Sequence, residues 1–87
     1  MATMKLSVLR YLVAFADEGT FSRAAERCHV SQPTLSVAVQ NLEDELGVRL
    51  IERGKGHAAL TPVGERVVAQ ARRVLEETRR IETVAEG

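Results

Sequence analysis

The sequence is poor in the residues that mark secreted, disulfide-bonded or membrane-spanning proteins. It has a single cysteine, Cys28, no tryptophan and only two prolines among 87 residues, so a disulfide framework is excluded and a reducing, cytoplasmic location is expected. No apolar run approaches the roughly 18 residues that a membrane span requires, and the first residues lack the apolar stretch of a signal peptide. The formal net charge is zero, which by itself argues against a protein that binds nucleic acid indiscriminately.

The residues that are present favour one small, mostly helical domain. Apolar residues make up 45% of the chain but aromatics only 3%, so Leu, Val, Ile and Ala must form the core. A lone copy of this length buries only about 60% of its unfolded surface and is expected to be marginally stable. Residues 1–47 carry four basic and six acidic side chains, whereas residues 48–87 carry eight basic and six acidic ones. Three of the basic residues surround a glycine-rich turn.

Hydrophobic spacing predicts two helices in the first third of the chain. Apolar residues recur every three or four positions between Val8 and Ala16, and Gly19 suits the C-terminal end of this helix. Thr20 can then cap a second, short helix over residues 21–28.

A third helix is predicted to start after the three-residue connection 29–31. Ser31 can cap it, and Pro33 in its first turn loses no needed hydrogen bond. The helix is expected to end at Gly47, and its apolar residues form a buried stripe: Leu35, Val39, Leu42 and Leu46.

The pattern then changes from helix to strand and back. Residues 50–53 and 59–61 are predicted to form two very short strands around the basic tip 54–58. Thr61 followed by Pro62 is a strong start for a fourth helix, which runs to about Ala85. At about 1.5 Å per residue, this helix is longer than so small a domain can cover.

The second and third helices match the helix-turn-helix pattern, in which small residues lie where two helices cross. Ala25 is expected at the crossing, Val30 in the turn, and Leu35 with Ala38 on the inner face of the third helix. His29 stands where glycine is often found. The competing interpretation is an ordinary helical hairpin inside a bundle.

The outer face of the third helix favours DNA binding over that alternative. A solvated helix normally carries Glu and Lys there, whereas this face has no carboxylate before Glu43-Asp44-Glu45, which would point away from phosphates. Glutamine can pair with adenine, and small apolar groups can contact the thymine methyl. We therefore predict that base edges are read by Gln32, Pro33, Thr34, Ser36, Val37 and Gln40.

Hydroxyls, helix N-termini and cations around this face can bind the phosphate backbone. The glycine-rich tip suits a wing that lies against the backbone or in the minor groove. The candidates for backbone or wing contacts are Thr20, Ser22, Arg23, Ser31, Arg49, Arg53 and Lys55. A plain helix cap is the alternative role for Thr20, and a bland surface turn is the alternative for the tip.

Together these features resemble the N-terminal domain of LysR-type transcriptional regulators. The resemblance extends from Leu6 to the end of the fourth helix. Its motifs are Phe21-Ser-Arg-Ala-Ala-Glu-Arg-Cys28, Val30-Ser-Gln-Pro-Thr-Leu-Ser36, Leu42-Glu43, Leu46-Gly47-Val48, Leu50, Glu52-Arg53 and Leu60-Thr61-Pro62-Val-Gly64. Residues 28–36 with residues 42–48 are most similar to the peroxide-responsive OxyR branch.

The resemblance implies a winged helix-turn-helix DNA-binding domain over residues 1–61, mostly α with a small β-hairpin wing, and a linker helix over residues 62–87 that dimerises. The recognition helix 32–46 would enter the major groove of double-stranded promoter DNA, and the wing 53–57 would lie on the backbone or in the minor groove. The family also implies an effector-binding domain that is absent from this chain. In OxyR-like proteins that domain carries the sensing cysteines, which leaves Cys28 as a packed thiol. Such a regulator is expected to be cytoplasmic and nucleoid-associated.

The sequence departs from the family pattern at three positions of the interface. Many members carry Arg or Lys where this chain has Val37 and Gln40, and a basic residue where it has Gly56. Readout is therefore expected to depend on Gln32, Ser36 and methyl contacts, because a guanine-reading Arg is missing from that face.

The fourth helix carries a coiled-coil seam that favours a homodimer. Its seam positions alternate at intervals of four and three: Val67, Ala71, Val74, Thr78, Ile81 and Ala85. Val68 and Leu75 form a second stripe for the first helix of the same or the partner chain. The alternative is one amphipathic helix folded back on its own domain. Two DNA-binding domains joined by one dimerisation helix suit a partly palindromic site. For the full-length protein, the sequence leaves open a dimer or a tetramer.

Other classes of function fit the sequence poorly. His29 and His57 have no cysteine or carboxylate cluster at metal-ligand spacing, and no glycine-rich phosphate loop precedes a helix. We therefore expect no enzyme, no cofactor and no metal. The remaining alternative is a helical protein-interaction module that dimerises without binding DNA.

Overall fold

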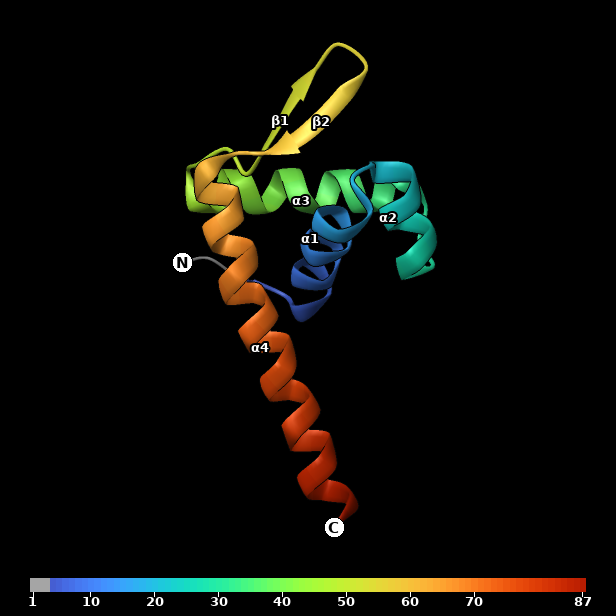
Figure 1. Cartoon of the computed structure of the whole chain (residues 1–87), viewed down its shortest axis with the longest axis vertical. Helices are drawn as coiled ribbons and strands as arrows, with labels where there is room; N and C mark the ends of the chain where they lie inside the picture. Colours follow the sequence, from blue (N-terminus) through green and yellow to red (C-terminus); the bar gives the residue numbers. More distant parts are fainter. Residues whose placement is uncertain (1–3) are drawn as a thin grey trace.

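The computed structural model describes residues 4–87, and this part of the chain folds into four helices and one antiparallel hairpin (Figure 1). In chain order these are α1 (Leu6–Glu18), α2 (Phe21–Cys28), α3 (Gln32–Leu46), β1 (Ile51–Gly54), β2 (His57–Leu60) and α4 (Pro62–Glu86). The hairpin projects from one side of the body formed by α1, α2 and α3, and α4 runs away on the opposite side. The predicted mostly helical fold with a small hairpin is confirmed.

Local hydrogen bonds end and start the helices where the sequence predicted. Gly19 follows α1 with φ 84° and Gly47 follows α3 with φ 70°, the left-handed conformation that glycine adopts without strain. The hydroxyls of Thr20, Ser31 and Thr61 each accept a backbone N–H three residues further on, at 3.0–3.2 Å. These three N-caps precede α2, α3 and α4.

The hydrophobic core lies between α1, α2, α3 and the base of the hairpin. Its largest fully buried side chains are Phe15, Leu12, Leu35, Leu50, Ile51 and Val39, and burial of each contributes about 1.5–3 kcal/mol. The stripe predicted on α3 is buried except for Leu46, which is 36% exposed. Leu46 belongs to the last turn of α3, and Leu50 and Ile51 fill this end of the core after the chain reverses at Gly47.

The hairpin is longer than predicted. Its register pairs Ile51 with Leu60 and continues to Gly54 opposite His57, so the predicted tip 54–58 is reduced to a two-residue turn, Lys55 and Gly56. Gly56 has φ +76°, a left-handed conformation that glycine adopts without strain. Pairing can therefore continue almost to the end of the wing.

A buried carboxylate fixes the hairpin to α3. Glu43 is 6% exposed, and its Oε2 accepts the backbone N–H groups of Leu50 at 2.8 Å and Ile51 at 3.1 Å. The sequence pattern groups Glu43 with Asp44 and Glu45 as acids that point away from phosphates, whereas the structure turns Glu43 inward and leaves Asp44 and Glu45 exposed.

Helix α4 packs on the body with its first turns and then leaves it. Gly64, Val68 and Ala71 are buried, whereas Ile81 is 68% and Val84 79% exposed. The helix thus does not fold back along its whole length, and the molecule measures 49 × 29 × 20 Å. Within residues 4–87, no helix combines the length and apolarity needed to cross a lipid bilayer.

Candidate nucleic-acid interface

The turn between α2 and α3 has the geometry of a helix-turn-helix. Ala25, at 3% exposure, is buried in α2, and its carbonyl accepts the Val30 N–H at 3.0 Å. His29 has φ 59° and is the one non-glycine residue with positive φ between residues 4 and 87. It therefore takes the left-handed conformation for which glycine is often used at this point. Val30 packs against the core beside it.

The predicted base-reading residues lie on the outside of α3. Gln32, Pro33, Thr34, Val37 and Gln40 are exposed and Ser36 is half-buried, whereas Leu35 and Val39 on the opposite face are fully buried. Val37 is 54% exposed, so its methyl groups are free for a contact outside the chain.

Two of these candidates are already engaged within the chain. The Thr34 hydroxyl lies 2.8 Å from that of Ser31, which also caps the helix, so both hydroxyls have local roles. Gln32 Oε1 accepts the Ser22 hydroxyl at 3.3 Å, which joins α2 to the start of α3. A carbonyl oxygen has a second lone pair, so Gln32 keeps an acceptor and its amide donors for a base.

A groove of about 470 Å³ separates these helices from the wing. It is lined by Thr20, Ser22, Gln32 and Ser36 on the helical side and by Arg53 and His57 on the hairpin. The structure thus brings predicted base-reading and backbone-binding residues, which are far apart in the sequence, to the two sides of one groove. Thr20 and Arg23 also have a plain capping contact, because the Thr20 hydroxyl accepts the Arg23 backbone N–H.

The cations of the wing differ from those of the helices in their partners. Arg49, Arg53 and Lys55 are exposed, and none of them forms an ion pair within the part of the chain that the structure describes. By contrast, Arg27 and Arg72 bind carboxylates. The wing therefore presents unneutralised positive charge although the whole chain is neutral.

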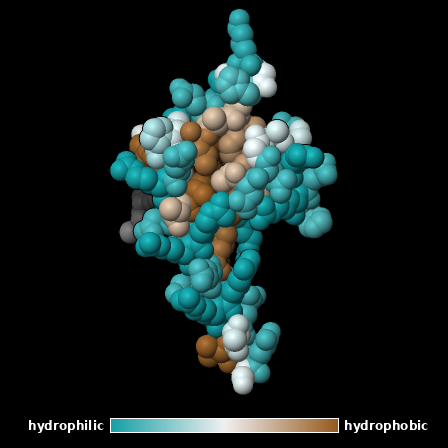
Figure 2. All heavy atoms as spheres, in the orientation of Figure 1, coloured by the Kyte–Doolittle hydropathy of each residue, from teal (hydrophilic) through white to brown (hydrophobic). Residues whose placement is uncertain are grey.

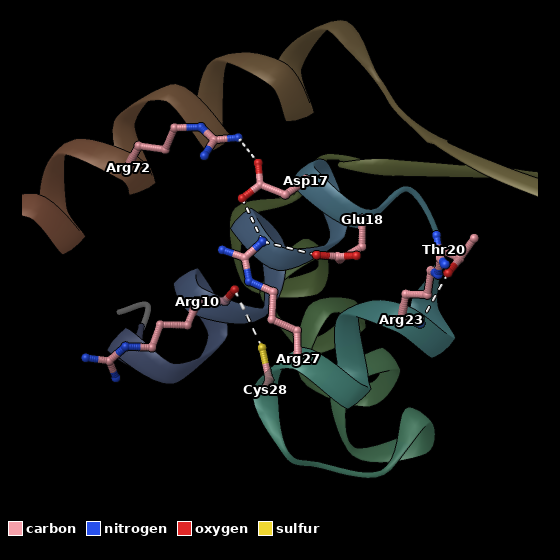
Figure 3. A network of polar contacts seen from close by, with 8 residues as sticks. All are labelled: Arg10, Asp17, Glu18, Thr20, Arg23, Arg27, Cys28 and Arg72. Carbon is pink, nitrogen blue, oxygen red and sulfur yellow. Dashed lines mark hydrogen bonds and ion pairs between the residues drawn. The ribbon is translucent and has the colours of Figure 1, made fainter.

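An ion-pair network that the sequence did not reveal joins three helices (Figure 3). Asp17 at the end of α1 accepts from Arg72 of α4 at 2.6 Å and from Arg27 of α2 at 2.8 Å. The Arg72 hydrogen bond, followed by that of Arg27, lowers the pKa of the Asp17 carboxyl below its ordinary value. Arg72 thus fastens α4 to α1.

Cys28 is a half-buried thiol at the end of α2. Its Sγ lies 3.9 Å from the Arg10 carbonyl oxygen (Figure 3). Burial raises the pKa of the thiol, although the nearby charges of Arg27 and Arg10 oppose the shift. These surroundings are those of a packed side chain rather than a reactive thiolate.

The predicted seam of α4 is divided between the chain's own core and its free surface. Ala71 is only 2% exposed and Val67 is half-buried, because α4 packs on α1 at this level, so Ala71 has almost no surface left for a partner. Val74, Ile81 and Ala85 are exposed. The Thr78 hydroxyl donates to the Leu75 carbonyl at 2.6 Å.

Apolar side chains are also exposed at separate places on the surface. Figure 2 shows hydrophobic atoms in the centre of the body and again near the free end of α4. A cavity of about 530 Å³ between α1 and α4 is lined in part by Val13, Ala14 and Leu75. Within residues 4–87, no three His, Cys, Asp or Glu side chains are grouped as metal ligands would be.

Comparisons with known proteins agree with this geometry. Residues 6–65 match a family model described as bacterial regulatory helix-turn-helix protein, lysR family. The chain is 49% identical over 82 residues to the DNA-binding transcriptional dual regulator OxyR of Escherichia coli. The matched region covers 94% of this chain and 27% of the relative. It therefore spans about a quarter of the length of such curated relatives.

Solved structures show the same similarity. A full-length OxyR variant from Pseudomonas aeruginosa is 60% identical with a TM-score of 0.93, over 97% of this chain and 28% of that chain. The DNA-binding domain of BenM, in a crystal structure with catB site 1 DNA, is 37% identical with a TM-score of 0.90, over 95% of this chain and 92% of that chain.

Proposed function

The chain belongs to the lysR family of bacterial regulatory helix-turn-helix proteins, and we propose that it is the DNA-binding part of an OxyR-like transcription regulator, which binds a partly palindromic promoter site as a homodimer. The observation that carries this proposal is the groove that holds Gln32 and Ser36 of α3 on one side and Arg53 of the wing on the other. Arg53 has no ion-pair partner within residues 4–87. The similarity to the BenM domain solved with DNA supports it. The relatives named as transcription regulators offer no support for an enzyme.

In this proposal the N-terminal half of α3 enters the major groove. Gln32 and Gln40 can pair with base edges, and the exposed Val37 can contact a thymine methyl. Pro33, Thr34 and Ser36 complete the base-reading surface. Glu43 is the only buried acid in the part of the chain that the structure describes. Its carboxylate binds the start of the hairpin, so it does not repel phosphates.

The wing and the helix N-termini position the domain on the backbone. Arg49, Arg53 and Lys55 can neutralise phosphates or enter a narrow minor groove. On the helical side, Ser22 lies at the start of α2 and Ser31 immediately before α3, where backbone N–H groups also favour anions. Arg23 and Thr20 stand beside them.

The part of α4 that is left uncovered supports homodimerisation. Its outer half presents Val74, Ile81 and Val84 to solvent, and no other part of residues 4–87 covers them. The cavity bounded by α1, α2 and α4 has polar as well as apolar walls, and Leu75 and Thr78 of this half line it. We therefore propose a seam formed by Val74, Thr78, Ile81 and Ala85, with the half-buried Val67 at its edge, whereas Ala71 is buried in the chain's own core and contributes little.

Pairing also reconciles DNA binding with a neutral chain. Two domains on one connector share an effective concentration that a single domain lacks. If each domain uses the three wing cations, about six phosphate contacts predict a log–log slope of affinity against salt near −5. Fluorescence anisotropy with promoter DNA between about 50 and 300 mM salt measures this slope, and a slope near −10 would contradict the proposal.

The base-reading role is tested by substitution on sites selected from random DNA. Gln32→Ala should cost about 1–3 kcal/mol and relax the preference at one base position, whereas Lys55→Ala should weaken all sequences alike. Gln70→Ala on the exposed side of α4 is the matched control and should change neither. If Gln32→Ala weakens every sequence equally, it does not read bases. If the wild-type chain shifts no promoter DNA, the alternative of a helical interaction module replaces the proposal.

A further inference from the structure

Arg53 is held by an aromatic ring rather than by an acid. Its guanidinium carbon lies 5.0 Å from the centroid of the Phe21 ring, within the range of a cation–π contact. Phe21 in turn stacks on Phe15 with ring centroids 4.8 Å apart. Because Phe15 is 2% exposed, this stack connects the wing cation to the hydrophobic core.

The choice of partner matters for an arginine that must bind an anion. The carboxylates of Asp17 and Glu18 restrain Arg27 and Arg72 but also neutralise them. A ring restrains the guanidinium through its quadrupole and leaves the positive charge and the N–H donors available. Within residues 4–87, Arg53 has no ion-pair partner that would compete for its donors.

The position of the ring decides where that charge is held. Phe21 starts α2, directly after Thr20, and lines the same groove as Arg53, Ser22 and Gln32. The hairpin is only two strands wide, and Arg53 is exposed on β1, so the strand alone leaves this long side chain many rotamers to lose on binding.

This inference rests on the proposed DNA-binding function. We propose that Phe21 is a positioning residue, which holds the Arg53 guanidinium in the groove between α2 and the wing. The guanidinium is then already ordered when it meets a DNA phosphate or the edge of the minor groove. Phe21 itself makes no contact with DNA in this inference. It acts by reducing the ordering cost that Arg53 would otherwise incur on binding.

A double-mutant cycle on the full chain tests the inference. Phe21→Leu removes the ring but keeps an apolar side chain, and Arg53→Gln removes the charge but keeps hydrogen-bonding groups. Affinity for one selected DNA site is measured by anisotropy for both single variants and for the double variant. Circular dichroism first establishes that each variant is folded at the assay temperature, and Phe21→Tyr, which keeps the ring face, serves as the conservative variant.

The expected results distinguish positioning from a structural role. Phe21→Leu should weaken binding about two- to tenfold and leave the salt slope unchanged, whereas Arg53→Gln should weaken binding and reduce the slope by about 1 per chain. In the Arg53→Gln background, Phe21→Leu should have almost no further effect, and Phe21→Tyr should bind like the wild type.

Two outcomes would overturn the inference. If Phe21→Leu weakens the Arg53→Gln variant as much as it weakens the wild type, the ring acts through the fold and not through Arg53. If Arg53→Gln binds like the wild type, the guanidinium does not meet DNA. Both differ from failure of the proposed function, in which the wild-type chain itself would not bind.

Discussion

Replacing Glu43 should reveal that the wing is fastened to the recognition helix by one carboxylate oxygen. Glu43 Oε2 accepts the backbone N–H groups of Leu50 and Ile51 at the start of the hairpin, and the site is buried. Glu43→Ala leaves both N–H groups without an acceptor, where water has little access. Glu43→Gln keeps one oxygen that can accept both N–H groups but removes the charge.

The expected magnitudes follow from the cost of each loss. An orphaned buried N–H costs about 1–3 kcal/mol, so Glu43→Ala should lower the free energy of unfolding by about 2–6 kcal/mol. A neutral acceptor bonds about half as strongly as a charged one, so Glu43→Gln should lose about 1–3 kcal/mol. An 87-residue domain has only about 4–13 kcal/mol of stability in total, so the loss expected for the alanine variant is a large fraction of that total.

Urea denaturation followed by circular dichroism measures these differences. Asp44→Ala and Glu45→Ala are the controls, because both neighbours are exposed and should change stability by no more than about 0.5 kcal/mol. Protein concentration must be equal in all samples, since a dimer gains apparent stability with concentration. If Glu43→Ala is as stable as Asp44→Ala, the carboxylate does not hold the wing and the reasoning fails.

Three further predictions concern the frame around the interface. Gly64→Ala should destabilise the fold by about 1–3 kcal/mol or more, because a Cβ there would overlap the Leu50 carbonyl oxygen; a thermal midpoint within about 2 °C of wild type would contradict it. The pKa of Asp17 is lowered in the folded state, so its contribution is present above the unfolded-state pKa and lost as pH falls below about 4. The free energy of unfolding of Asp17→Asn, measured against pH, should therefore lie less than about 1 kcal/mol below that of the wild type near pH 7. The two values should converge in acid, and a constant difference across the pH range would refute this. Burial raises the pKa of Cys28, so iodoacetamide should modify it more slowly in the folded chain than in urea, and equal rates would show that the thiol is not packed.

The sequence was sufficient wherever the structure is decided by neighbouring residues. Thr20, Ser31 and Thr61 cap helices because a hydroxyl reaches the N–H three residues on, a distance set by local geometry. Gly19 and Gly47 end helices for a similarly local reason. The candidate face of α3 followed from helical periodicity, since burying Leu35 and Val39 turns Val37 and Gln40 outward.

What the sequence left open depends on contacts between distant segments. Asp17 and Arg72 are 55 residues apart, and nothing in the composition of either helix selects this pair from the other acids and arginines. The inward position of Glu43 requires the chain to turn back so that two N–H groups face the helix. The burial of Ala71 likewise depends on the angle at which α4 crosses α1, and a heptad-like spacing predicts the same seam at any angle.

The zero net charge of the chain says little about its interface once the partners of each arginine are known. Arg27 and Arg72 bind Asp17, and Arg80 binds Glu76 and Glu77, so these cations and acids cancel one another within the helices. The cations of the wing have no such partners between residues 4 and 87. Local charge rather than the sum sets the field that a phosphate meets at close range, because salt screens anything further than about 8–10 Å. A neutral chain can therefore present a basic edge, because most of the acids that balance its charge lie outside the wing.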